Sequence, residues 1–419
     1  MNCSTNILIN AMSVHPKHGS EFGFAWNWIL EISKRYEYVH VHTSIHQDNQ
    51  DDILRYIEEA NINNLKFNFI SFPKWVNVIP FNFLKRYLKY WAWHFKSYRK
   101  AKTLKKSINL SLVHQLNTIG FRIPGFMFLL NLPVVWGPIG AGEQYDYRLF
   151  SHLRNKAKIN KLLYNIINKF QWSFSPYINY CFRRANIIIT STSELANLVS
   201  KKCFFNKDKV FHIPETAAIH TVKKIEIDED NKSLKLCFAG LLHDRKNLKF
   251  VLDALIQLDD IRFSFYVCGK GPLENYYKDY VKNHNIKGVY WYPWLSKEEC
   301  SKLIASSDIF VLPSIREANS SVIFEALSQA KPVISLDISG MSDTIINGKN
   351  GFKIPISSNR SIMVNDLSLI LKKLLNDFNL LRKLSEGALT SANKHLYSNR
   401  IDELQPIYYQ AIQNFYKLN

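Results

Sequence analysis

The stretch DIFVLPSIREANSSVIFEALSQAKPVISL, residues 308–336, decides the fold of this chain. Its first part, DIFVLPS, is an apolar run typical of a buried strand, and PVISL at its end predicts a second strand. SSVIFEALSQA between them predicts a helix with Ser320 or Ser321 as the N-cap. A strand, a helix and another apolar strand in this order indicate a parallel sheet that helices cover on both faces.

The same alternation of strands and helices runs along the whole chain. Candidate strands of the first half are 6–11, 39–45, 65–72, 111–116, 133–140, 186–192 and 210–214, and those of the second half are 234–240, 263–269, 289–294, 308–314 and 332–336. Helical stripes are formed by Phe24, Trp28, Ile32 and Tyr36 and, near the end, by Leu404, Tyr408, Ala411 and Phe415. We therefore expect an α/β fold with two Rossmann-like, doubly wound domains.

A polar connection, residues 215–233, separates the two series of strands. We place the domains at residues 1–213 and 214–396, followed by a C-terminal helix at 397–419, for which packing on the N-terminal domain is one option. Two such domains facing each other form a cleft, and open α/β sheets bind ligands at the carboxyl ends of their strands. The residues after each strand are therefore the candidates for chemistry.

The charge of the chain is concentrated in one segment. The 419 residues carry a formal net charge of +19, and residues 60–193 hold 20 Lys and Arg against two acids, Glu143 and Asp146. Basic residues interleaved with aromatic rings suit an anionic membrane or nucleic acid, whereas a solvated helix with core aromatics is the simpler alternative. The candidate membrane contacts are Lys85, Arg86, Lys89, Trp91, Trp93 and Lys96.

The N-terminus does not have the pattern of a signal peptide, and the longest strongly apolar stretch, 123–136, is shorter than the roughly 20 residues that span a bilayer. The six cysteines are scattered singly, which is typical of free thiols in a reducing compartment. We expect a cytoplasmic protein that lies on the inner face of the cell membrane.

Two glutamates, Glu317 and Glu325, stand eight positions apart in the opening stretch. Such a pair could be a general acid and base, a metal clamp, or the solvated start of a helix. Glu317 falls in the loop before the predicted helix, and Glu325 lies on the order of 6 Å further along its axis. The helix N-terminus between them has free N–H groups and a positive dipole end. A nucleotide diphosphate would fit there, with the carboxylates accepting hydrogen bonds from sugar hydroxyls.

Other candidates also follow predicted strands. Gly19 opens a loop that could bring backbone close to a phosphate, and Arg245 and Lys246 stand at a helix entrance where they could neutralise a diphosphate. Gly271 belongs to a tight turn, and His114 at a strand end could polarise a reacting hydroxyl. An ordinary turn, surface cations and a core histidine are the alternatives. No cluster has the spacing of a metal site, and we interpret Asp-Glu-Asp at 228–230 as linker charge.

Several of these motifs together resemble the family 4 (group 1) retaining glycosyltransferases of the GT-B fold. PSIREANSSVIFEALSQAKPVIS and GMSDTIINGKNGF resemble the region of the family's two glutamates, and FAGLLHDRKN and CGKGPL fall in the family's order. HGSEFGFAWNW, VHQLN and VVWGPIGAGE resemble a branch with a Gly-Ser-Glu loop and a Trp-Gly-Pro turn. The similarity covers nearly the whole chain and is strongest over 234–355.

The resemblance implies a donor nucleotide-sugar linked to UDP or GDP, transfer with retention, and no metal or other cofactor. It places Glu325 on the ribose hydroxyls and Glu317 near the donor sugar. Lys246 matches the family's diphosphate lysine, Gly19 its glycine loop and His114 the histidine near acceptor and donor sugar, which gives His114 and Glu317 catalytic roles. The backbone N–H groups that would line sugar and diphosphate belong to Ala318, Asn319, Ser320 and Ser321.

The chain departs from the family at two positions. Leu241 stands where the family often has an arginine, and Arg245 is our candidate for its replacement. Pro293 stands where a glycine often precedes the base-contacting loop, which makes Trp294 a candidate to flank the base.

The expected function is transfer of a sugar to a glycan or lipid-linked acceptor in bacterial surface polysaccharide synthesis, such as capsule, O-antigen or exopolysaccharide. The expected partners are the nucleotide-sugar, the acceptor and an anionic membrane surface, and not nucleic acid. A sugar-nucleotide epimerase, an inverting GT-B enzyme and a non-catalytic membrane- or nucleic-acid-binding protein on a degenerate scaffold are the alternatives.

Overall fold

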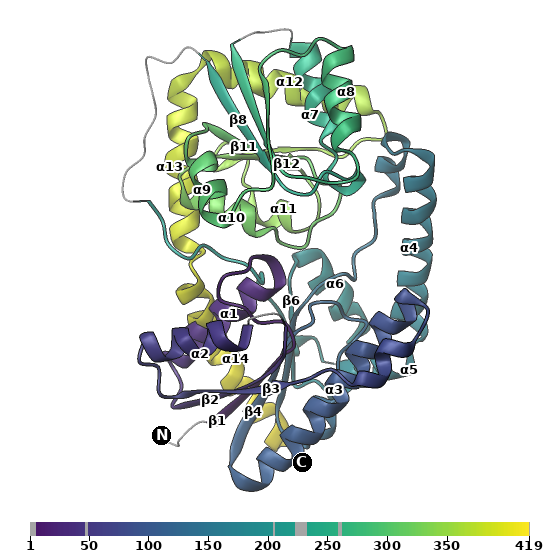
Figure 1. Ribbon diagram of the computed structural model, residues 1–419, viewed down its shortest axis with the longest axis vertical. Coiled ribbons are helices and arrows are strands. Elements are labelled where there is room, and N and C mark those ends of the chain that lie inside the picture. Colours follow the sequence, from purple (N-terminus) through teal and green to yellow (C-terminus); the bar gives the residue numbers. More distant parts are fainter. Residues whose placement is uncertain (1–5, 47–48, 204–205, 223–232, 259–261, 419) are drawn as a thin grey trace. The chain divides into compact units, whose positions relative to one another are not determined.

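The computed structural model describes residues 6–46, 49–203, 206–222, 233–258 and 262–418 (Figure 1). It consists of two compact units. Unit 1 comprises residues 1–143, 168–215 and 397–419, and unit 2 comprises residues 144–167 and 216–396. Each unit holds one sheet, and every named strand pair in the described chain is parallel. The expected α/β class with two Rossmann-like sheets is confirmed.

The sheet of unit 1 has the order β3-β2-β1-β4-β5-β6-β7. Its strands are β1 (Asn6–Ala11), β2 (Tyr38–Ser44), β3 (Leu65–Ile70), β4 (Leu110–Asn117), β5 (Val134–Ile139), β6 (Ile187–Thr190) and β7 (Val210–His212). The order reverses between β1 and β4, as in doubly wound sheets. The central strands are buried almost throughout, because helices cover both faces of a parallel sheet and leave no solvated side.

The helices of unit 1 are α1 (Ser20–Ser33), α2 (Asn49–Glu59), α3 (Asn82–Ser107), α5 (Pro176–Arg184), α6 (Ser193–Lys202) and α14 (Tyr397–Leu418). Short 3-10 turns are η1 (Lys74–Val78), η2 (Met127–Leu129) and η4 (Lys207–Lys209). The C-terminal helix α14 packs against α1 and β4 although it is last in the chain. Leu404, Tyr408 and Ala411, the expected apolar stripe, are buried there.

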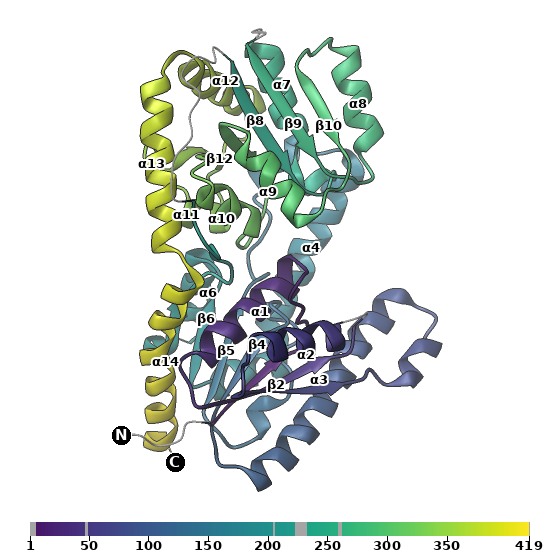
Figure 2. The ribbon, with the colours of Figure 1, turned by 60° about the vertical axis from the view of Figure 1, so that its left-hand side comes forward.

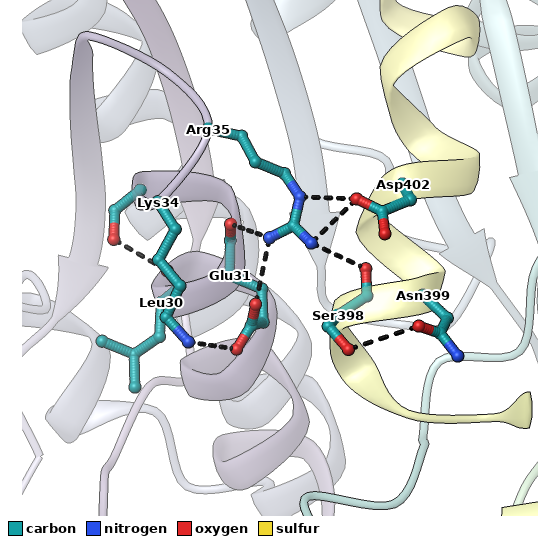
Figure 3. A network of polar contacts seen from close by, with 8 residues as sticks. Leu30, Glu31, Lys34, Arg35, Ser398, Asn399 and Asp402 are labelled. Atoms are coloured by element: carbon teal, nitrogen blue, oxygen red, sulfur yellow. Dashed lines mark hydrogen bonds and ion pairs between the residues drawn. The ribbon is translucent and has the colours of Figure 1, made fainter. Parts of the chain in front are cut away.

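An ion-pair network joins α14 to α1 in unit 1 (Figure 3). Arg35 donates to Asp402 through Nε at 2.8 Å and to the backbone oxygen of Ser398 at 3.0 Å. The same guanidinium pairs with Glu31, one turn back on α1, at 3.0 Å. Because a planar guanidinium offers donors in several directions, one arginine can bridge both helices.

The sheet of unit 2 has the order β10-β9-β8-β11-β12-β13. Its strands are β8 (Leu234–Ala239), β9 (Phe263–Cys268), β10 (Val289–Tyr292), β11 (Ile309–Leu312), β12 (Val333–Leu336) and β13 (Gly351–Ile354). Figure 2 shows β8, β9 and β10 side by side. The edge strand β13 was not among the expected strands, because its four residues begin with glycine and include a lysine.

The helices of unit 2 are α7 (Lys249–Leu258), α8 (Glu274–Asn283), α9 (Lys297–Ala305), α10 (Ser321–Ser328), α11 (Ser339–Thr344), α12 (Arg360–Asn376) and α13 (Phe378–Lys394). Short 3-10 turns are η3 (Tyr147–His152) and η5 (Asp244–Lys246). α7 packs with α12, and α10 packs with α13. The opening stretch of the sequence forms β11, α10 and β12, as predicted.

Residues 144–167 differ from the expected division of the chain, which assigned them to the first domain. They form η3 and the first part of α4 (Asn155–Phe174), and the structure groups them with unit 2. Tyr145, Leu149, Leu153 and Ala157 belong to the same buried cluster as β8 and β11. Their roughly four-residue spacing predicts a buried helical face, but such a pattern does not reveal which core it enters.

Candidate active site

Two loops meet at the carboxyl edge of the sheet of unit 2, because β8 and β11 are neighbours in it. The loop after β8 forms η5, and the loop after β11 leads into α10. The backbone N–H of Ile315 donates to the Arg245 oxygen at 2.9 Å, and the Asn247 amide donates to the Pro313 oxygen at 3.3 Å. Asn247 has φ +51°, a left-handed conformation that asparagine tolerates and that turns the chain into α7.

Glu317 forms ion pairs with both cations of the first loop. Its Oε1 lies 2.7 Å from Nζ of Lys246, and its Oε2 lies 2.9 Å from Nη1 of Arg245. Burial alone would raise the pKa of Glu317, but the two cations outweigh it and hold this pKa below its ordinary value. Burial lowers the pKa of Lys246, and the Glu317 carboxylate partly offsets that effect. Glu317 is therefore ionised at neutral pH and is unsuited to act as a general acid.

Glu325 lies on α10 in a different environment. Burial raises its pKa above the ordinary value, with Lys297 and the Ser321 side chain opposing that shift. The two glutamates of the opening stretch are thus shifted in opposite directions. The cause is that Glu317 has two cations in direct contact, whereas Glu325 is mainly desolvated.

The N-terminus of α10 lies between the two glutamates. Ser320 is its N-cap residue, as one of the two expected options, but its side chain makes no capping hydrogen bond. Ala318, Asn319, Ser320 and Ser321 are all half-buried. Since the first N–H groups of a helix have no intrahelical acceptor, this helix end has the donors and the partial positive charge that an anion requires.

Gly340 supports the loop that carries Glu317. Its N–H donates to the Glu317 backbone oxygen at 3.2 Å. A Cβ at this position would lie 1.4 Å from the Ala318 oxygen, a distance that no side chain could occupy. Glycine is therefore required here for the start of α11 to press against residues 317–318.

Arg316 adds a contact that the sequence did not reveal. Its guanidinium lies over the rings of Tyr145, at 5.1 Å, and Tyr164, at 4.7 Å, and its Nη2 donates to the Tyr164 hydroxyl at 2.8 Å. Arg154 likewise pairs with Asp244 at 3.0 Å. Residues 144–167 thus contact both loops of the site, through Arg316 and through Asp244. The only sequence signal was that Arg316 and Asp244 adjoin predicted site residues.

The remaining donor candidates of unit 2 follow the strands β8, β9 and β10. A Cβ on Gly271 would lie 2.5 Å from the Leu242 oxygen, so the close approach of two backbone segments explains the glycine. Leu241, which stands where the resemblance leads us to expect an arginine, is 44% exposed, and Trp294 is 54% exposed. Both side chains are therefore accessible to a ligand.

Gly19 is the N-cap residue of α1 in unit 1 and is exposed. Its φ of −86° is open to any residue, and a Cβ there would meet nothing within 4 Å. The protein's own packing thus does not require glycine at this position. Glu21, two residues later, was not singled out from the sequence. Its carboxylate accepts from the N–H of Ile119 at 3.1 Å, and burial raises its pKa.

His114 occupies the core of unit 1, which favours the core histidine of the alternative interpretation over a catalytic role. It is fully buried, and its Nε2 lies 2.6 Å from the Gly137 oxygen, while its Nδ1 contacts the Tyr408 hydroxyl. A carbonyl can only accept, so Nε2 carries the proton and Nδ1 accepts from Tyr408. Burial lowers its pKa to about 4. With both nitrogens occupied, His114 has the environment that is typical of a core histidine.

Among the candidate membrane contacts on α3, Trp93 is likewise a correction. It is fully buried, and its indole N–H donates to the Ile70 oxygen at 3.0 Å. Lys96 donates to the Ser71 oxygen at 2.8 Å, and Lys89 lies 4.0 Å from the centre of the Phe72 ring. Trp91 is half-buried against Phe126 and Tyr177. Lys85 is half-buried, and Arg86 is exposed.

Within the described residues, none of the helices combines the length and apolar character needed to cross a bilayer. Nor do three or more His, Cys, Asp or Glu side chains of that part of the chain gather in a group that could hold a metal ion. The described cysteines Cys181, Cys203, Cys237, Cys268 and Cys300 are free thiols. The Asp-Glu-Asp at 228–230 lies outside the described residues.

Residues 221–390, all within unit 2, match the family model of glycosyl transferases group 1. An uncharacterised glycosyltransferase of Methanocaldococcus jannaschii is 23% identical over 56% of this chain and 62% of its own length. A putative colanic acid biosynthesis glycosyltransferase of Salmonella typhimurium is 22% identical over 43% of this chain and 47% of its own length. The chain thus spans only about half to three fifths of such curated relatives.

A solved structure covers nearly the whole chain. Anabaena HepE in complex with UDP and glucose superposes with a TM-score of 0.60 at 14% identity, over 96% of this chain and 98% of its own. This likeness shows the GT-B fold. The family match is thus confined to residues of unit 2, whereas the likeness of fold extends over both units.

Proposed function

We propose that the protein is a glycosyltransferase that moves a sugar from a UDP- or GDP-linked donor to a glycan or lipid-linked acceptor. The observation that supports this proposal most is the Glu317–Lys246–Arg245 cluster beside the N-terminus of α10. Two cations and a helix end provide for a diphosphate, and two carboxylates of opposite pKa shift provide for hydroxyl groups.

In this proposal the diphosphate lies along α10 and shares Lys246 and Arg245 with Glu317. Sharing is feasible because an ammonium has three N–H donors and a guanidinium five, so neither cation is exhausted by one carboxylate. Glu325 accepts from the ribose hydroxyls, and Trp294 flanks the base. Glu317 faces the donor sugar. Gly19 of unit 1 remains a proposed donor-binding residue, at a position where the chain's own packing does not need a glycine.

The main catalytic contribution in this proposal is electrostatic. When the bond to the sugar breaks, negative charge grows on the departing diphosphate, and Lys246, Arg245 and the helix N-terminus stabilise that charge. Transfer proceeds with retention and without a metal. The setting is bacterial surface polysaccharide synthesis, with α3 facing an anionic membrane on the cytoplasmic side through residues such as Arg86.

A nucleotide screen tests the donor site. UDP or GDP and the corresponding nucleotide-sugars should raise the melting temperature of the wild-type protein. The nucleotide-sugars should also be hydrolysed slowly, and EDTA should prevent neither effect. Lys246→Met should abolish the shift, because the diphosphate loses a charge-assisted contact. Lys249→Met is the matched control, because Lys249 pairs with Asp253 on α7. This variant should leave the shift unchanged.

If no nucleotide shifts the melting temperature of the wild type, or if Lys246→Met and Lys249→Met behave alike, the donor-site assignment is wrong. Where transfer occurs, the anomeric configuration of the product, measured by NMR, distinguishes retention from inversion.

A further inference from the structure

Helix α4, labelled in Figure 1, carries a stripe of apolar side chains that are exposed to solvent. The exposed apolar side chains on it are Ile159 (60%), Leu162 (43%), Leu163 (49%), Ile166 (56%), Ile167 (52%), Phe170 (63%) and Phe174 (69%). At 3.6 residues per turn these seven positions fall within an arc of roughly 140°. Ala157 and Asn165, which are buried, lie on the opposite side of the helix. One side of α4 is thus buried, and the opposite side presents the apolar stripe to solvent.

A contiguous apolar surface of this kind is rare on a soluble protein without a partner. The charges of α4 indicate which partner. Residues 155–174 contain four lysines, Lys156, Lys158, Lys161 and Lys169, and no acidic residue. In the same helix geometry, Lys158 and Lys169 lie along one edge of the stripe. An apolar stripe with a lysine border is complementary to the acyl boundary and the phosphates of an anionic bilayer.

We propose that α4 is a membrane-docking helix that lies in the interface of an anionic lipid surface with this stripe, and with Lys158 and Lys169 at the lipid phosphates. The inference rests on the membrane part of the proposed function and deepens it, because it names a surface other than α3. On α3, Trp93 is buried and Lys96 is bonded to backbone, so that helix has fewer free groups for lipid.

A second copy of the chain is a less suitable occupant. Pairing two α4 stripes would bring lysines of both copies together, and α4 has no carboxylate to compensate them. Tyr164 connects the proposed docking helix to the loop that carries Glu317. It lies on the side of α4 away from the stripe and contacts Arg316, the neighbour of Glu317.

Vesicle flotation with the full-length protein tests the inference. The stripe variant is the triple substitution Ile159→Gln, Leu163→Gln and Ile166→Gln. Wild type should float with equimolar phosphatidylglycerol and phosphatidylcholine vesicles, and the stripe variant should bind at least about tenfold more weakly, since three apolar side chains leave the acyl boundary. Binding of the wild type should also fall in salt near 1 M, where the screening length is about 3 Å.

Ile362→Gln with Leu369→Gln is the matched control, because these residues are equally exposed on α12 of unit 2. It should float like wild type. Wild-type binding by the stripe variant, or loss of binding in the α12 control as well, overturns the inference. So does a stripe variant that changes from dimer to monomer in light scattering while its vesicle binding is unchanged, which would assign the stripe to a second copy.

The nucleotide-induced melting shift, measured on the same samples, separates this inference from the proposed function. Loss of flotation with a normal shift in the stripe variant supports docking through α4. A wild type that shows the nucleotide shift but ignores anionic vesicles contradicts the docking surface alone. A wild type that floats but responds to no nucleotide contradicts the donor site and leaves the docking surface standing.

Discussion

The two units have the same order of strands at the centre of their sheets, yet they treat ionisable groups differently. At the carboxyl edge of unit 2, Glu317 remains charged against Lys246 and Arg245. In unit 1, His42 and His114 of the sheet and His94 of α3 are held neutral. Burial lowers the pKa of His114 to about 4 and those of His42 and His94 to about 3. Charge kept in a loop at the sheet edge is available to a ligand, whereas buried neutral rings serve packing.

The largest expected effect breaks the charged side of this comparison. Lys246→Met should lower the transfer rate by about 10²–10³-fold, as loss of one group that stabilises transition-state charge typically does. It should also lower the free energy of unfolding by roughly 1–3 kcal/mol, because Glu317 loses a buried partner.

The double variant Lys246→Met with Glu317→Leu separates these two effects. It should recover stability in urea unfolding, since no unpaired carboxylate remains, but not activity. Recovery of the rate along with stability would show that the ion pair serves only the fold.

The second effect concerns the neutral side. His114→Ala should lower the free energy of unfolding by about 2–4 kcal/mol, because a cavity forms and Tyr408 and Gly137 lose a partner. The rate per folded molecule should stay within about threefold of wild type at low temperature, whereas loss of a general acid or base costs about 10²–10⁴-fold. A rate loss of that size would assign His114 a catalytic role.

The pH dependence of stability provides an independent measure of His114. The unfolded histidine titrates near its ordinary pKa of about 6.5, so the unfolded state binds more protons than the folded state between that pH and about 4. The contribution of the buried, neutral His114 to the free energy of unfolding is on the order of 3 kcal/mol. It is fully present above pH 6.5 and is lost as the pH falls toward 4. The free energy of unfolding of the wild type, measured in urea, should therefore fall more steeply as the pH is lowered over this range than that of His114→Gln.

The smallest effect sharpens the comparison by testing how the charged loop is held. Tyr164→Phe removes the hydrogen bond to Arg316 and keeps the ring beneath its guanidinium. It should lower kcat by about three- to tenfold with little change in KM for the donor, corresponding to one hydrogen bond of about 0.5–1.5 kcal/mol. Arg316→Gln should have a larger effect in the same direction, because both ring contacts are lost as well. An unchanged kcat in both variants would limit Arg316 to a structural role.

Much of this molecule follows from local patterns. The expected strand at residues 6–11 coincides with β1, and the stretch 308–336 forms the expected strand, helix and strand, because apolar periodicity and cap residues act over a few neighbouring residues. The two loops that carry Lys246 and Glu317 could also be placed at one edge, since the carboxyl ends of parallel strands share an edge.

What the sequence could not decide depends on contacts between distant residues. Trp93 and His114 have the residue types of a membrane anchor and a catalytic base, and only burial assigned both to the core. Residues 144–167 precede a unit 1 segment in the chain but pack in unit 2, where Tyr164 reaches Arg316 over 152 positions. Local pattern determined that the chain forms two doubly wound sheets with a charged loop after β11. The tertiary structure decided which ionisable groups stay charged, because desolvation and ion pairing depend on neighbours that the chain brings together only when it folds.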